Sequence, residues 1–129
     1  MPLKTTVEKR GEGSYLVRLH GRLDTATTPG CEKKIMPLLK EKVRTLVLDA
    51  AGLDYISSVG LRLILQLRKS LEAGKGKLAL THLQPPVARV FEVAEILPRT
   101  DVFDTVESAD IYLDALQRRE AVKDFDESE

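Results

Sequence analysis

The chain has 129 residues with 20 basic and 20 acidic side chains, so its formal net charge is zero, and 43% of its residues are hydrophobic. This length and balance are typical of one soluble globular domain, and the zero net charge excludes a bulk attraction to nucleic acid or to an anionic membrane. The single cysteine, Cys31, excludes an intrachain disulfide. No apolar run approaches the ~20 residues of a membrane span, and the N-terminus has no apolar signal core, so we expect a cytoplasmic protein.

The first third of the chain predicts a hairpin followed by a helix. Thr5–Lys9 and Tyr15–His20 have strand patterns, and the turn Gly11-Glu12-Gly13 between them fits a hairpin. The pair Thr28-Pro29 indicates an N-cap and a first helical residue, and an apolar stripe follows at helical spacing. Because an interior proline costs about 3 kcal/mol or more, we expect Pro37 to kink or break this helix.

Residues 46–71 combine a buried strand, a pair of serines and an amphipathic helix. Leu46-Val47-Leu48 is a continuous apolar run that suits a strand covered on both faces. We expect a short loop after it that closes on Ser57-Ser58-Val59-Gly60, where the helix begins. A helix N-terminus presents unpaired N–H groups and a partial positive charge, so the two hydroxyls lie where an anion such as phosphate is favoured. The apolar stripe of the helix comprises Leu61, Ile64, Leu65, Leu67 and Leu71.

The remaining sequence continues the alternation of strands and helices. We expect a strand at Lys77–Thr81, a helix opened by Pro85-Pro86, a short strand near Val102-Phe103 and a last helix from about Thr105. Together these elements predict a single α/β domain with a mixed sheet of about four to five strands and about four helices, mainly on one face. We place this domain at residues 1–122, followed by a flexible acidic tail at 123–129.

Enzymatic chemistry is poorly supported by the residues available. The sequence has no G-x-S-x-G elbow, no Walker loop and no cluster of metal ligands, so we expect neither catalysis nor a metal or other cofactor. His20 and His82 are the only histidines, and each is interpreted as structural or solvated. Cys31 lies on an apolar helix face and is expected in the core.

Short motifs from roughly residue 5 to residue 116 follow the order and spacing of a known family. They are Gly21-Arg22-Leu23-Asp24 with the run Thr25–Pro29, then Leu48-Asp49, Tyr55–Arg62, Gly74–Leu80, Leu83–Val87 and Phe103–Ala109. Through these motifs the chain resembles a STAS domain, and specifically the stand-alone bacterial anti-sigma factor antagonists.

The resemblance implies a protein that switches between partners. In this family the unphosphorylated antagonist binds an anti-sigma factor, itself a serine kinase of the GHKL ATP-binding type, and the sigma factor is released. Phosphorylation of a serine at the helix N-terminus ends the complex, and a separate serine phosphatase restores it. We expect the same two partners here, for a chain that is a monomer or a weak dimer.

The serine pair departs from the pattern of the best-known members, which carry Asp-Ser-Ser-Gly with the phosphorylated serine directly before glycine. Aligned on Gly60, this chain has Ser57 in place of the aspartate and Val59 at the phosphorylated position. Another branch has two serines, a small apolar residue and glycine, as here. It implies Ser58 as the acceptor, with Ser57 as the second choice.

Other interpretations of the serine pair stay open. Serine is a good N-cap, worth about 1 kcal/mol, so one serine can cap the helix while its neighbour faces solvent. A member without phosphorylation would be a scaffold subunit of a larger signalling assembly. A STAS domain from an anion transporter and an acyl-transfer enzyme using Ser58 are more distant alternatives.

The predicted partner surface extends along one side of the serine helix. Successive helical residues turn by about 100°, so Arg62 lies one turn after Ser58, and Gln66 and Lys69 continue the same stripe. Asp24 is expected near the serines, either as part of the switch surface or as a turn residue. Gly60 in a first helical turn indicates close backbone approach, by a neighbouring segment or by a partner. The predicted partner-binding residues are Asp24, Thr25, Ser57, Ser58, Val59, Gly60, Arg62, Gln66 and Lys69.

Overall fold

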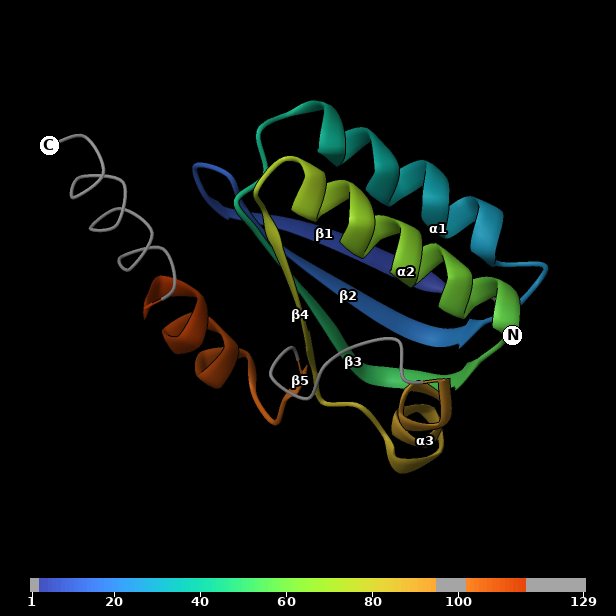
Figure 1. Ribbon diagram of the computed structural model, residues 1–129. Coiled ribbons are helices and arrows are strands. Elements are labelled where there is room, and N and C mark those ends of the chain that lie inside the picture. Colours follow the sequence, from blue (N-terminus) through green and yellow to red (C-terminus); the bar gives the residue numbers. More distant parts are fainter. Residues whose placement is uncertain (1–2, 95–101, 116–129) are drawn as a thin grey trace, which may run out of the picture.

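The computed structural model describes residues 3–94 and 102–115, and these residues form one mixed β-sheet with helices packed against it (Figure 1). The sheet has five strands in the order β1-β2-β3-β4-β5. β1 and β2 are antiparallel, whereas β2, β3, β4 and β5 are parallel to one another. The strands are β1 (Lys4–Gly11), β2 (Ser14–Leu23), β3 (Thr45–Ile56), β4 (Lys77–Thr81) and β5 (Val102–Phe103).

Helices connect the parallel strands, because parallel pairing requires a crossover instead of a tight turn. α1 and α2 lie side by side over one face of the sheet, and the helix formed by residues 106–115 lies over the opposite face (Figure 1). α3 contributes Val87 and Phe91 to the core under α1 and α2. Most described helices therefore share one face, as the sequence predicts. The helices are α1 (Thr28–Ile35), the 3₁₀ helix η1 (Met36–Lys40), α2 (Ser58–Ala73) and α3 (Pro85–Ala94).

The amino-terminal hairpin forms where the sequence predicts it. β1 pairs with β2 across a turn that contains Gly13, whose φ of 74° is readily adopted by glycine. Tyr15, Val17 and Leu19 of β2 are all buried on one face, as the alternation in the sequence indicates. Both strands extend beyond the predicted residues.

The centre of β3 is buried on both faces of the sheet. Leu46 and Leu48 belong to the main core beneath α1 and α2, and Val47 between them belongs to a smaller cluster on the opposite face. All three side chains are at most 1% exposed. The prediction of a strand covered on both faces is therefore confirmed. The smaller cluster consists of Leu16, Val47, Ala79, Ala109 and Leu113.

β3 is longer than the sequence predicts. The loop expected between the apolar run Leu46-Val47-Leu48 and the serine pair is instead strand as far as Ile56. Gly52 and Asp54 are poor strand formers, which is why the local pattern indicates a loop. Parallel pairing with β2 continues to Leu23, opposite Ile56, with two register shifts along the way. The predicted loop is therefore wrong because hydrogen bonds to a distant strand hold this segment extended.

α1 has a different first residue from the one predicted, and ends near the predicted break. Thr27, not Thr28, is the N-cap residue. The Oγ1 of Thr27 makes no capping hydrogen bond, because it donates to the carbonyl oxygen of Arg22 in the preceding loop. The α-helix ends at Ile35 and η1 follows at once with Pro37 in its first turn, so the predicted break is confirmed.

The second half of the chain follows the prediction closely. β4 and β5 lie at the predicted residues, and α3 begins at Pro85. The last helix, expected from about Thr105, begins at residue 106. The domain boundary predicted at residue 122 and the acidic tail after it lie outside the described residues.

Candidate functional site

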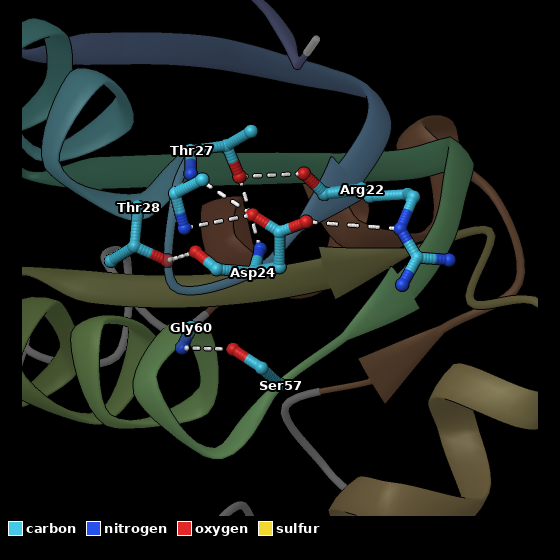
Figure 2. Close-up of polar contacts among 7 residues, drawn as sticks. Arg22, Asp24, Thr27, Thr28, Ser57 and Gly60 are labelled. Atoms are coloured by element: carbon cyan, nitrogen blue, oxygen red, sulfur yellow. Dashed lines mark hydrogen bonds and ion pairs between the residues drawn. The ribbon is translucent and has the colours of Figure 1, made fainter. Parts of the chain in front are cut away.

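The two serines at the start of α2 have different environments. Ser57 is the N-cap residue with extended backbone, and its Oγ accepts a hydrogen bond from the backbone N–H of Gly60 at 3.2 Å (Figure 2). The side chain of Ser57 is half-buried, whereas Ser58, the first helical residue, is exposed. Ser57 therefore caps the helix while Ser58 faces solvent, which is one of the arrangements that the sequence leaves open.

The first turn of α2 is hydrogen-bonded to the end of β2 and packs closely against it. The backbone N–H of Ser57 donates to the carbonyl oxygen of Leu23 at 2.9 Å. A Cβ atom on Gly60 would lie 2.7 Å from Cγ of Leu23 and 2.8 Å from its carbonyl oxygen, closer than such atoms approach in folded proteins. Gly60 is therefore required by a close approach within the chain, which accounts for a glycine in a helical turn.

Asp24 follows Leu23 and organises the loop between β2 and α1. Its Oδ1 accepts hydrogen bonds from the backbone N–H groups of Ala26 and Thr27, both at 3.0 Å (Figure 2). Its Oδ2 lies 3.8 Å from Nε of Arg22. The backbone N–H of Thr27, helped by the other donors and the Arg22 guanidinium, lowers the pKa of Asp24 below its usual value. Asp24 therefore acts as a turn residue, which is one of the two roles expected for it from the sequence.

Further hydrogen bonds make this loop a compact unit next to the serines. The Oγ1 of Thr27 accepts from the backbone N–H of Asp24 at 3.0 Å, and the Oγ1 of Thr28 donates to the carbonyl oxygen of Asp24 at 2.6 Å (Figure 2). Thr25 is exposed at the tip of the loop. Because Leu23 accepts from Ser57, the loop and the first turn of α2 are held together at one end of the sheet.

Arg22 and Tyr55 form a contact that the sequence analysis did not identify. They face each other across β2 and β3, and the guanidinium carbon of Arg22 lies 4.1 Å from the centre of the Tyr55 ring. Tyr55 is 41% exposed, so the pair is an accessible cation–π contact, worth about 0.5–1 kcal/mol at exposed sites. Both residues lie within the motifs of the family resemblance, and this was the one sequence signal that could have pointed to them.

The predicted stripe along α2 is exposed and continuous with Ser58. Arg62, Gln66 and Lys69 are all exposed, while the opposite side of the helix packs on the sheet. Val59 is half-buried and Gly60 is buried. The structure therefore brings the predicted site residues to one end of the sheet and one side of α2. Those nearest the sheet, Ser57 and Gly60, make contacts within the fold.

The predicted structural roles of several other polar residues are also visible. Oδ1 of Asp49 accepts a hydrogen bond from the backbone N–H of Ala51 at 3.0 Å and lies 3.1 Å from Nδ1 of His82. Cys31 is buried in the main core, and burial raises the pKa of its thiol.

Within residues 3–94 and 102–115, no group of three or more His, Cys, Asp or Glu side chains is placed to hold a metal ion. None of the helices in that part of the chain is long and apolar enough to cross a membrane.

Comparisons with known proteins identify relatives of similar length. BtrV, a candidate anti-sigma factor antagonist of Bordetella bronchiseptica, is 35% identical over 107 residues, covering 83% of this chain and 91% of the relative. The anti-sigma-B factor antagonist of Staphylococcus aureus is 27% identical over 79 residues, covering 61% of this chain and 73% of the relative.

Solved structures show the same fold. The anti-sigma factor antagonist SpoIIAA of Bacillus, in its unphosphorylated form, superposes with a TM-score of 0.72 at 24% identity, covering 92% of this chain and 97% of SpoIIAA. A family model described as STAS domain matches residues 5–109. The strand order, the serine pair at the start of α2 and these matches together establish that the chain belongs to the STAS domain family, with relatives named as anti-sigma factor antagonists.

Proposed function

We propose that this chain is a cytoplasmic anti-sigma factor antagonist that acts by partner switching. Its unphosphorylated form binds an anti-sigma factor that is also a serine kinase of the GHKL type. The kinase phosphorylates Ser58, which ends the complex, and a serine phosphatase restores the binding form. The chain itself is not an enzyme, and its docking surface comprises Ser58 and the exposed residues Arg62, Gln66 and Lys69, with the Asp24 loop at its edge.

This proposal is supported by the different environments of the two serines, since Ser57 caps α2 and Ser58 is exposed. The Oγ of Ser57 is half-buried and used in capping α2, so a phosphate there would remove a bond that helps to start the helix. Ser58 is exposed in the next position. Its hydroxyl is therefore accessible to a kinase, and its modification leaves the capping bond in place.

The position of Ser58 also explains how a phosphate would act on binding more than on folding. A phosphoserine carries about −1.5 to −2 charges at pH 7, and the positive end of a helix favours an anion. The fold therefore tolerates the modification. A partner that covers Ser58 would have to remove water from this dianion, and burial of an unpaired charge is costly. The complex is consequently the state that phosphorylation destabilises.

The acceptor can be identified by incubating the protein with its kinase and ATP and measuring intact mass. We expect one phosphate on the wild-type chain and none on Ser58→Ala. Ser57→Ala serves as the matched control: it should lose about 1 kcal/mol of folding stability through the missing cap, yet still accept the phosphate. Phosphate that persists on Ser58→Ala and is absent from Ser57→Ala would assign the acceptor to Ser57.

If neither substitution changes the mass gain, or if no phosphate is added by a kinase that binds the protein, partner switching at this site is wrong. The second candidate, a scaffold subunit of a signalling assembly, would then account for the result. It is favoured by Val59, which occupies the position where the best-known antagonists resembling this chain carry their phosphorylated serine.

A further inference from the structure

Arg62 is placed to contact any group attached to Ser58. The two residues are four apart in α2, and side chains at this spacing are neighbours, with about 5–6 Å between their Cβ atoms. Both side chains are exposed. The guanidinium of Arg62 can therefore reach an anionic group on the hydroxyl of Ser58 without any movement of the backbone.

Arg62 also differs in its present partners from the two arginines of β2, Arg18 and Arg22. Arg22 lies 3.8 Å from the carboxylate of Asp24 and over the ring of Tyr55, and Arg18 lies between two carboxylates at 3.6 and 3.7 Å. Within the part of the chain that the structure describes, no ion pair involves Arg62. A phosphate would therefore gain this guanidinium without breaking an existing ion pair.

The first turn of α2 holds no competing negative charge. Residues 58–61 read Ser-Val-Gly-Leu, so the positive end of the helix is not offset by an acidic side chain. A phosphate on Ser58 would be the first anion in this turn, and a guanidinium binds phosphate through charge-assisted, often bidentate, hydrogen bonds.

We propose that a phosphate on Ser58 is held by Arg62 of the same chain. This inference rests on the proposed function, in which Ser58 is the acceptor. Its consequence is that one modification changes two features of the docking surface. The partner meets a dianion in place of a hydroxyl, and the cation of Arg62, which the unphosphorylated chain offers to the partner, is withdrawn into an intramolecular pair.

The pair can be tested without a kinase, on full-length protein carrying phosphoserine introduced at position 58 during synthesis. A nearby cation favours the dianionic phosphate, so it lowers the second pKa of the phosphate. Titration followed by ³¹P NMR should give a lower pKa in the wild-type phosphoprotein than in Arg62→Gln. Arg62→Lys should give an intermediate value, because lysine keeps the charge and loses the forked donor geometry.

Lys69→Gln is the matched control for net charge. It removes one positive charge from the same exposed side of α2, but residue 69 lies about 16 Å along the helix from Ser58 at about 1.5 Å per residue. We expect its phosphate to titrate like that of the wild type. Identical titration of wild type and Arg62→Gln, or an equal shift in Lys69→Gln, would overturn the proposed pair.

The result is independent of whether partner switching itself is correct. If the kinase adds no phosphate, the proposed function fails, and if it modifies Ser57, the acceptor is reassigned. In both cases the titration of the installed phosphoserine still reports whether Arg62 contacts it. If the kinase modifies Ser58 and the titration shows no effect of Arg62, the proposed function stands and the pair is refuted.

Discussion

The inner and outer sides of the first turn of α2 differ in how strongly the rest of the fold determines them. On the inner side, Ser57 caps the helix, and Gly60 lies against the backbone and side chain of Leu23. On the outer side, Ser58 is exposed, as is Arg62 one turn further on. This difference separates two kinds of residue within one helical turn. Changes on the inner side should alter folding, whereas changes on the outer side should alter only what the surface can bind.

The largest effect is expected on the inner side, from Gly60→Ala. The added Cβ would lie within 3 Å of both Cγ and the carbonyl oxygen of Leu23, and backbone cannot move aside as a flexible side chain can. We expect a loss of about 1–3 kcal/mol in the free energy of unfolding, measured by urea denaturation.

Gly30→Ala in α1 is the matched control for this substitution. An added Cβ at Gly30 meets nothing within 4 Å, and alanine has the higher helix propensity, so stability should be unchanged or slightly raised. Equal stabilities of Gly60→Ala and the wild type would show that the contact with Leu23 does not constrain the turn.

The next effect is expected on the outer side, from Ser58→Asp. The carboxylate lies at the positive end of α2, so the melting temperature should stay equal or rise slightly. Binding to the kinase should weaken at least tenfold, about 1.4 kcal/mol, when measured by titration calorimetry. A variant that unfolds, or one that binds as tightly as the wild type, would contradict the separation between the two sides.

A smaller effect is expected one turn further on, from Arg62→Glu. The free energy of unfolding should change by no more than about 0.5 kcal/mol, as is usual for an exposed position. Kinase binding should fall about fivefold, close to 1 kcal/mol, because charge reversal at an interface disturbs electrostatic complementarity. Gln66→Glu should show a smaller loss of the same kind.

Lys40→Glu is the control for the position of the docking surface. Lys40 is exposed at the end of η1, outside the surface proposed here, so its charge reversal should leave kinase binding unchanged. If Lys40→Glu weakens binding while Arg62→Glu does not, the partner docks on the side of α1 and η1, and the outer side of α2 has a different role.

The order of the elements and the position of the serine pair could be predicted from local sequence patterns. Apolar residues recur with the period of a strand around Val17 and with the period of a helix after Gly60, and these periods are properties of neighbouring residues. The break at Pro37 follows from a single ring that cannot continue a helix. The family resemblance likewise used short motifs, each contained within a few consecutive residues.

Which side chains meet across the sheet depends on contacts between distant segments, and these became visible in the three-dimensional structure. β3 continues to Ile56 because β2 pairs with it, Gly60 is required because Leu23 lies against it, and Arg22 stacks on Tyr55 because the two strands align them. Each of these contacts joins residues more than thirty positions apart. Local periodicity does not show which distant residues pair with each other, since the pairing of strands is set by the free energy of the whole core.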